Sequence, residues 1–107
     1  MKRVLLTFAA LAAVTMAAPA MADEALAKSK NCMACHSVDK KLVGPSYKDV
    51  AAKFAKDPGA VEMLAGKIMK GSTGVWGAVQ MPPNANVREA EANKLTAMVM
   101  THETAVP

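Results

Sequence analysis

Five consecutive residues, Cys-Met-Ala-Cys-His from Cys32 to His36, constrain this chain more than any other feature of its sequence. They include both cysteines of the 107-residue protein and one of its two histidines. In a helical segment the second thiol follows the first by three residues and the imidazole follows it by four, so all three groups project from one face. The chain must therefore fold around whatever these three groups hold.

Three chemistries use such a cluster: a dithiol redox pair, a structural metal site and covalent attachment of haem. A thioredoxin-like dithiol expects a preceding strand, and no alternating pattern precedes Cys32. A structural zinc site takes four protein ligands, and only His102, close to the end of the chain, could complete it. Haem uses all three groups, because the thiols add to its two vinyl groups and the imidazole reaches the iron. Cys-x-x-Cys-His is the attachment signature of c-type haem, so we predict one covalent haem c on Cys32 and Cys35, with His36 as an axial ligand.

The first 22 residues have the pattern of a secretory signal peptide. A basic start, Lys2 and Arg3, precedes an uncharged apolar run and the small residues around Ala20 and Ala22. We expect cleavage after Ala22, with residues 23–107 exported as one small domain. The alternative is an uncleaved anchor, since the apolar run could nearly span a bilayer. The exported part would carry a net charge of only +2, from 11 Lys and Arg against 9 Asp and Glu, which argues against a nucleic-acid partner.

Helical periodicity dominates the exported part and no stretch alternates like a strand, which predicts an all-α domain. Asp23 is placed to cap the first helix. A domain of this size with three aromatic residues has a marginal core of its own, so a large apolar cofactor is expected to complete it. The four expected helices are residues 23–32, 47–55, 57–71 and 86–102.

Capping residues mark the last two of these helices. Asp57 and Pro58 suit the start of the third helix and Gly71 its end. Asn86 and Glu89 have the spacing of a capping box at the start of the fourth. The side chains expected to face the core are Leu26, Ala27, Ala34, Val50, Ala51, Phe54, Val61, Leu64, Ala65, Ile68, Ala92, Leu95 and Val99.

Residues 71–85 contain three glycines and two prolines and are predicted to form a long loop. So long a loop in a compact domain is usually functional. Met81 lies in it, while the other five methionines of the exported part are expected in helical segments, where methionine commonly fills a core. Pro82 and Pro83 follow Met81 and restrict its backbone. We predict Met81 as the second axial ligand, and His102 is the alternative that would give bis-histidine iron.

Two stretches, "NCMACHSVDKKLVGPSYKDVAAKFA" and "GKIMKGSTGVWGAVQMPPN", resemble the small bacterial class I cytochromes c of the c-551/c-552 type. The resemblance covers essentially the whole exported part. It implies a single domain of about four helices around one covalently bound haem. It also implies a monomeric periplasmic carrier of single electrons, with a cytochrome bc1-type donor and a nitrite reductase or terminal oxidase as acceptor. No nucleic acid and no stable membrane association are expected.

The resemblance also implies roles for individual residues. Cys32 and Cys35 form the thioether links, and His36 and Met81 are the axial ligands. The haem environment comprises Pro45, Lys67, Trp76 and Asn84. The carbonyl of Pro45 accepts a hydrogen bond from the axial imidazole, and Trp76 and Lys67 meet a haem propionate. Asn84 orients the methionine loop.

The chain departs from the resemblance in three places. Ala27 and Met98 stand where many relatives have aromatic residues at the crossing of the first and last helices, which predicts weaker packing there. The connection "PNANVREAE" is one residue longer than usual, and the tail "THETAVP" is expected to fray.

A haem whose two axial positions are both filled by protein can only change oxidation state, so we predict an electron carrier and no enzyme. A five-coordinate haem enzyme or gas sensor would need a catalytic side chain at the open position, and the candidates are Arg88 and His102. A structural haem domain of a larger complex is the third possibility. Docking is expected through an apolar patch rimmed by lysines, comprising Val38, Val43, Pro82 and Pro83 with Lys30, Lys40, Lys41 and Lys48.

Overall fold

The computed structural model describes residues 19–102, and for residues 19–22 it describes the backbone alone. Most of the expected signal peptide and the tail after His102 therefore lie outside the described residues. Within the described part, no helix is long and apolar enough to cross a membrane.

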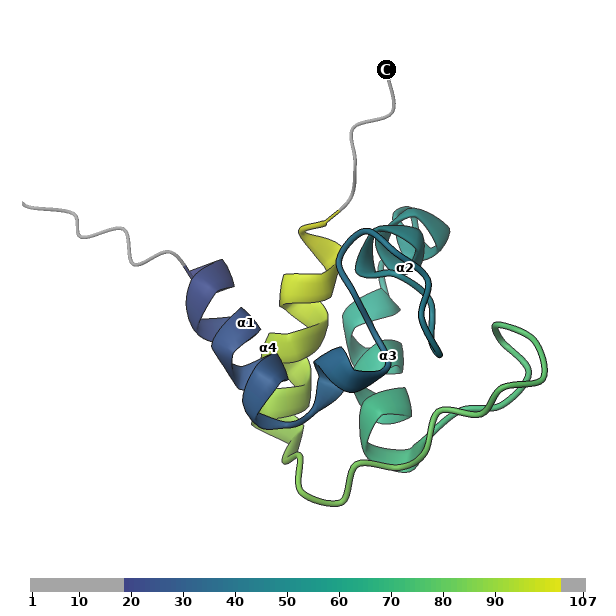
Figure 1. Ribbon diagram of the computed structural model, residues 1–107. Helices are drawn as coiled ribbons and strands as arrows, with labels where there is room; N and C mark the ends of the chain where they lie inside the picture. Colours follow the sequence, from purple (N-terminus) through teal and green to yellow (C-terminus); the bar gives the residue numbers. More distant parts are fainter. Residues whose placement is uncertain (1–18, 103–107) are drawn as a thin grey trace, which may run out of the picture.

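Four helices make up the fold, as the sequence predicts (Figure 1). They are α1 (Pro19–Ser29), α2 (Tyr47–Phe54), α3 (Ala60–Lys70) and α4 (Glu89–Met100), and a short 3₁₀ turn, η1 (Cys32–Ala34), follows α1. Helix α4 packs against each of the other three and lies at the centre of the arrangement. Between residues 19 and 102, β-structure is limited to two isolated bridges.

The buried core is built around α4. This helix contributes four buried apolar side chains, those of Ala92, Leu95, Met98 and Val99, at the spacing of one helical face. Ala27 of α1 is fully buried in the same cluster, and Met98 is 2% exposed. The residues at the crossing of the first and last helices are thus shielded from solvent despite the lack of aromatic residues there, and a flexible methionine is well suited to filling such a core.

Helix α1 differs from its predicted bounds at both ends. It begins at Pro19 rather than at Asp23, because proline is well tolerated in the first helical turn and the alanines after it continue the helix. It ends at Ser29 and does not reach Cys32, because Asn31 adopts a left-handed conformation with φ of 62°. Ala34, expected to face the core, is exposed in the turn that follows.

Helix α2 was predicted closely. Val50 and Ala51 are buried and Phe54 is partly buried, as its spacing indicates. Its cap, which the sequence analysis does not predict, is Ser46, whose hydroxyl accepts the Asp49 backbone N–H at 3.1 Å.

Helix α3 begins two residues later than a cap at Asp57 predicts, since its N-cap is Gly59. The Asp57 carboxylate accepts the backbone N–H of Gly59 at 2.8 Å, so this aspartate closes a turn ahead of the helix. The helix starts at Ala60, which is buried, whereas Val61 points outward and is 39% exposed. Gly71 ends the helix as predicted, with φ of 80°.

Helix α4 also uses a different cap from the predicted one. Asn86 and Glu89 do not form a capping box. Instead Glu91 accepts the backbone N–H of Arg88 at 3.1 Å, so that the helix begins at Glu89 and runs to Met100. The main-chain carbonyl of Asn86 accepts the Lys30 ammonium at 2.7 Å.

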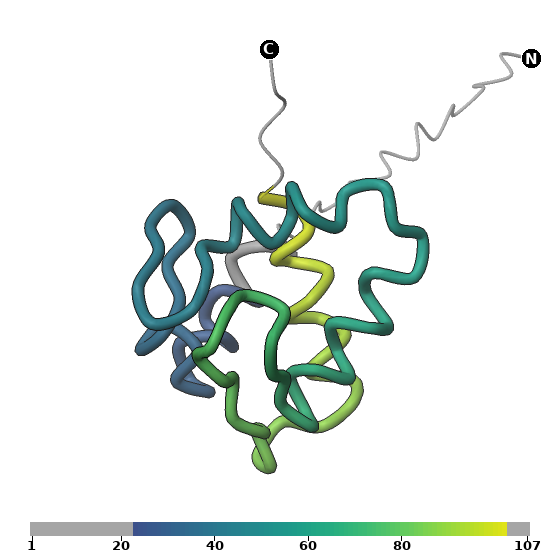
Figure 2. The backbone as a smooth tube through the Cα atoms, turned by 90° about the vertical axis from the view of Figure 1, so that its right-hand side faces the viewer, coloured from purple at the N-terminus to yellow at the C-terminus, as the bar shows by residue number. Residues whose placement is uncertain are grey.

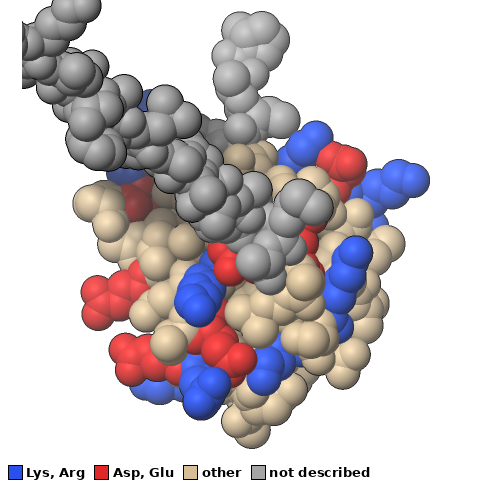
Figure 3. All heavy atoms as spheres, turned by 90° about the vertical axis from the view of Figure 1, so that its left-hand side faces the viewer, with Lys and Arg blue, Asp and Glu red and all other residues tan. Residues whose placement is uncertain are grey.

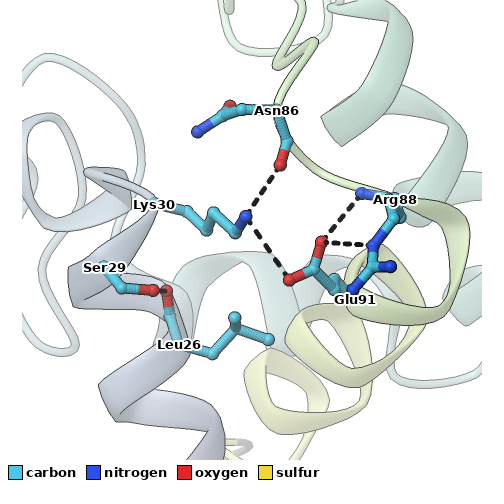
Figure 4. Close-up of polar contacts among 6 residues, drawn as sticks. All are labelled: Leu26, Ser29, Lys30, Asn86, Arg88 and Glu91. Atoms are coloured by element: carbon cyan, nitrogen blue, oxygen red, sulfur yellow. Dashed lines mark hydrogen bonds and ion pairs between the residues drawn. The ribbon is translucent and has the colours of Figure 1, made fainter.

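Lys30 ties the end of α1 to the start of α4 (Figure 4). Besides its bond to Asn86, its ammonium lies 3.4 Å from the Glu91 carboxylate. The Arg88 backbone N–H and the Lys30 and Arg88 side chains together hold the pKa of Glu91 below its ordinary value. Lys30 is therefore engaged in holding two helices together rather than standing free at the rim of a docking patch.

Candidate haem site

The turn that carries the cysteines is held by main-chain hydrogen bonds. The backbone N–H groups of Cys35 and His36 both donate to the carbonyl of Cys32, at 3.2 and 3.0 Å. The expectation of one α-helical face is thus wrong in detail, since the left-handed Asn31 converts the segment into a 3₁₀ turn. The turn still directs Cys32, Cys35 and His36 to one cavity. The two cysteines form no disulfide with each other, so both sulfurs are available to a group in the cavity.

His36 is oriented by a hydrogen bond to the chain that follows it. Its Nδ1 lies 2.7 Å from the carbonyl oxygen of Pro45, as the resemblance implies. A carbonyl only accepts, so Nδ1 carries the proton and Nε2 is left with a lone pair for a metal. This contact fixes the tautomer and raises the basicity of the ring, as partners of metal-ligating histidines commonly do.

Gly44 supports the imidazole from the same loop. A Cβ atom built on Gly44 would lie 2.6 Å from Cε1 of His36 and 3.0 Å from Nδ1. Only glycine lets the backbone approach the ring this closely. The Gly44 N–H also donates to the carbonyl of Cys35 at 2.8 Å, which closes the loop back onto the cysteine turn.

Met81 reaches the cavity from the long loop between α3 and α4. Its main chain is paired with Ser72 through two hydrogen bonds of 3.0 Å, Ser72 N–H to Met81 O and Met81 N–H to Ser72 O. Asn84 anchors the following residues, since its Nδ2 and backbone N–H donate to the Ile68 carbonyl of α3 at 2.9 and 3.0 Å. The pairing and this anchor fix where Met81 lies. The loop and the segment around Gly44 lie on the same side of the molecule (Figure 2).

The cavity between these two loops is mostly apolar. Three of its lining side chains, those of Val43, Trp76 and Val79, are 56%, 37% and 58% exposed, an unusual state for large apolar groups that face a cavity. Leu95 and Val99 of the α4 core line it at its base. A large, flat apolar group is what this lining suits.

The predicted site residues fall into two groups. Seven of them line the cavity: Cys32, Cys35, His36, Pro45, Lys67, Trp76 and Met81. Asn84 does not line it and instead anchors the loop to α3. Trp76 has a partner that the sequence did not indicate, because the Lys53 ammonium lies 5.1 Å from the centre of its ring.

The residues that the alternatives need lie elsewhere. His102 packs against Tyr47, with ring centroids 6.0 Å apart, and its Nε2 lies 3.7 Å from the Glu24 carboxylate. It does not line the cavity, and neither does Arg88, whose side chain is 87% exposed. In residues 19–102, no three His, Cys, Asp or Glu side chains gather as a metal site would require. Bis-histidine iron, an open catalytic haem and a structural zinc site therefore have no basis in the described structure.

Sequence reasoning missed two contributors to the site, Gly44 and Tyr47. Gly44 has a signal, since Gly-Pro follows the attachment motif at short distance, but such a pair by itself indicates only that a helix cannot continue. Tyr47 had none beyond being the single tyrosine of the chain. Its ring lies 5.6 Å from that of His36 at an interplanar angle of 30°.

These residues fit a haem c: two thiols beside an imidazole with a free Nε2, a thioether on a separately anchored loop, and apolar side chains between. The Cytochrome c family model matches residues 21–103. The chain belongs to the cytochrome c family. It carries one covalent haem c, and like the cytochromes c-551 and c-552 that it matches it is an electron-transfer protein and not an enzyme.

Individual relatives agree with this assignment. The chain is 53% identical over 95 residues to cytochrome c-552 of Nitrosomonas europaea, covering 89% of this chain and 91% of that one. It is 62% identical over 78 residues to cytochrome c-551 of Ectopseudomonas mendocina, covering 73% and 94%. The crystal structure of wild-type Nitrosomonas europaea cytochrome c552 superposes with a TM-score of 0.74 at 51% identity, covering 75% of this chain and 99% of that one. The four-helix fold is thus that of the small bacterial cytochromes c.

Proposed function

We propose that this cytochrome c is a periplasmic carrier of single electrons whose haem iron is held by His36 and Met81. The observation that supports this most directly is that the two side chains line one cavity from loops far apart in the sequence. Each is held by main-chain contacts, His36 through Pro45 and Met81 through Ser72. Bound haem c supplies a reversible one-electron couple, and a thioether ligand raises its potential relative to nitrogen ligands.

The chain's own residues do the remaining work in this proposal. Cys32 and Cys35 hold the group covalently on the side of the turn, so it cannot be lost on reduction or oxidation. Trp76 and Lys67 both line the cavity, and an indole N–H and an ammonium are donors suited to a propionate. Apolar side chains of the loops exclude water, which keeps the environment of the iron similar in both oxidation states.

Export follows from the N-terminal pattern. We propose that residues 1–22 are a signal peptide cleaved after Ala22, and that residues 23–107 act as a monomer in the periplasm. The proposed electron donor is a cytochrome bc1-type complex and the proposed acceptor a nitrite reductase or terminal oxidase. No stable membrane contact and no nucleic acid enter this function.

Docking to these partners is proposed at the opening of the cavity, where apolar lining residues are partly exposed. Val43 and Val79 are both more than half exposed there. Two of the four lysines expected at the rim of the patch are engaged in other contacts. Lys30 is bonded to Asn86 and Glu91, and Lys48 is paired with Asp39. On the opposite side, where α1 lies, basic and acidic side chains are interleaved (Figure 3). Apolar contact should therefore matter more than charge steering, as suits short-lived redox complexes.

The test of ligation is Met81→Ala. The oxidised wild-type protein is expected to show a weak thioether-to-iron charge-transfer band at the red end of the visible spectrum. The variant should lose this band, bind cyanide or azide readily and have a lower midpoint potential. Met63→Ala is the matched control, because Met63 is a partly buried methionine of α3 that does not line the cavity. A variant at Met81 that kept the band and the potential would refute the assignment.

A further inference from the structure

We propose that Tyr47 is a positioning residue for the imidazole of His36, and that Met33, the second residue of the attachment motif, holds Tyr47 in place. The proposal rests on the proposed ligation of iron by His36. It assigns a role to Met33, which lies inside the attachment motif but neither binds the haem covalently nor ligates its iron.

The contact between Tyr47 and His36 supplies a constraint that the Pro45 hydrogen bond does not. A single bond from Nδ1 to the Pro45 carbonyl fixes the tautomer but leaves the ring able to swing about that bond. The phenol ring, 5.6 Å away and tilted by 30°, limits this swing. The Gly44 backbone at Cε1 limits it further. The plane of the imidazole is thus set by three neighbours.

Tyr47 is itself fixed to the motif at two points. Its hydroxyl donates to the sulfur of Met33 at 3.4 Å, inside the motif. Its backbone N–H donates to the carbonyl of Ser37 at 2.9 Å, directly after the motif. The residue is only 5% exposed, so the ring and its hydroxyl are buried together against the motif.

Removing the acceptor of the hydrogen bond between Tyr47 and Met33 should cost more stability than removing its donor. A thioether is a weak acceptor, and no other side-chain or backbone partner of this hydroxyl occurs in residues 19–102. Replacing Met33 with leucine keeps the volume but leaves a buried hydroxyl unsatisfied, which is more costly than removing the hydroxyl itself. Tyr47→Phe removes both the donor and the need for an acceptor. The two substitutions are therefore coupled.

The experiment uses the haem-loaded protein and a double-mutant cycle of Met33→Leu, Tyr47→Phe and the double variant, with Tyr47→Leu to remove the ring. Three quantities are measured: the urea midpoint, the midpoint potential, and the haem-methyl proton shifts of the oxidised protein. Those shifts depend on the orientation of the axial ligands. Met63→Leu on α3 is the control for exchanging a methionine elsewhere.

Met33→Leu should lower the urea midpoint more than Tyr47→Phe does, and adding Tyr47→Phe to Met33→Leu should restore part of the loss. Tyr47→Leu should shift the haem-methyl resonances and the midpoint potential, while Tyr47→Phe should leave both near wild type. Additive effects in the cycle would overturn the role of Met33. Unchanged methyl shifts in Tyr47→Leu would overturn the role of Tyr47, even if stability fell. The charge-transfer band of the wild type separately reports whether the proposed ligation itself holds.

Discussion

Gly44 offers the sharpest test of how the site is built, because the structure gives the contact that any side chain would make. An alanine Cβ at this position would lie 2.6 Å from Cε1 of His36, nearer than such atoms approach in real structures, and 3.2 Å from Nε2. The imidazole cannot move away freely, since its Nδ1 is bonded to Pro45 and Tyr47 lies against the ring. Either the ring or the loop must shift.

The size of the effect follows from two opposing terms. Overpacking a well-filled site costs about 1–3 kcal/mol. The loss of glycine's conformational freedom in the unfolded chain offsets about 0.4–1 kcal/mol of this. Gly44→Ala should therefore lower the free energy of unfolding by roughly 1–2 kcal/mol. For a domain of this size each kcal/mol lowers Tm by about 4–8 °C.

The control is Gly66→Ala in α3. Nothing lies within 4 Å of a Cβ built at Gly66, and the residue is inside a helix. Alanine should stabilise the protein here by up to about 1 kcal/mol. Urea unfolding of both variants, followed by circular dichroism, measures the two changes. If Gly44→Ala were as stable as Gly66→Ala and kept the wild-type potential, the argument from close approach would fail.

Two further predictions concern charge and docking. Because the pKa of Glu91 is lowered in the folded protein, its contribution to stability should be present above the ordinary pKa of a glutamate and be lost as the pH falls through the lowered value. When unfolding is measured over a series of acidic pH values, the stability of Glu91→Gln should depend less on pH than that of wild type. An unchanged pH profile would contradict the contact between Lys30 and Glu91. Val43→Lys should slow electron transfer to an acidic partner at all ionic strengths in stopped-flow measurements, while Lys40→Glu should have a modest effect that salt removes. A dominant effect of the charge reversal would show that docking is mainly electrostatic.

Periodicity predicted the four helices because each buries one apolar stripe. The ends of the helices were less predictable, because they depend on which polar group happens to find a partner. Asp57 bonds to Gly59 ahead of α3, and Glu91 rather than Glu89 caps α4. The left-handed Asn31 could not be distinguished by sequence from a residue that continues α1.

The candidate site shows the same division. Residues with distinctive chemistry, such as Cys32, Cys35, His36 and Met81, could be proposed from type and spacing alone. Gly44 and Tyr47 could not, since their importance comes from distances to His36 that exist only in the folded chain. Asn84 was expected to orient the methionine loop, and its bonds to Ile68 show a means by which it can.

The double hydrogen bond between Ser72 and Met81 closes the base of the loop they bound. Positions of this loop that do not line the cavity, such as Thr73 and Ala78, can thus change in sequence while Met81 stays where it is. This separates two evolutionary pressures within one short stretch. The base of the loop holds the proposed iron ligand, whereas the positions outside the cavity lining can vary, so redox partners could diverge between species while the haem pocket is kept.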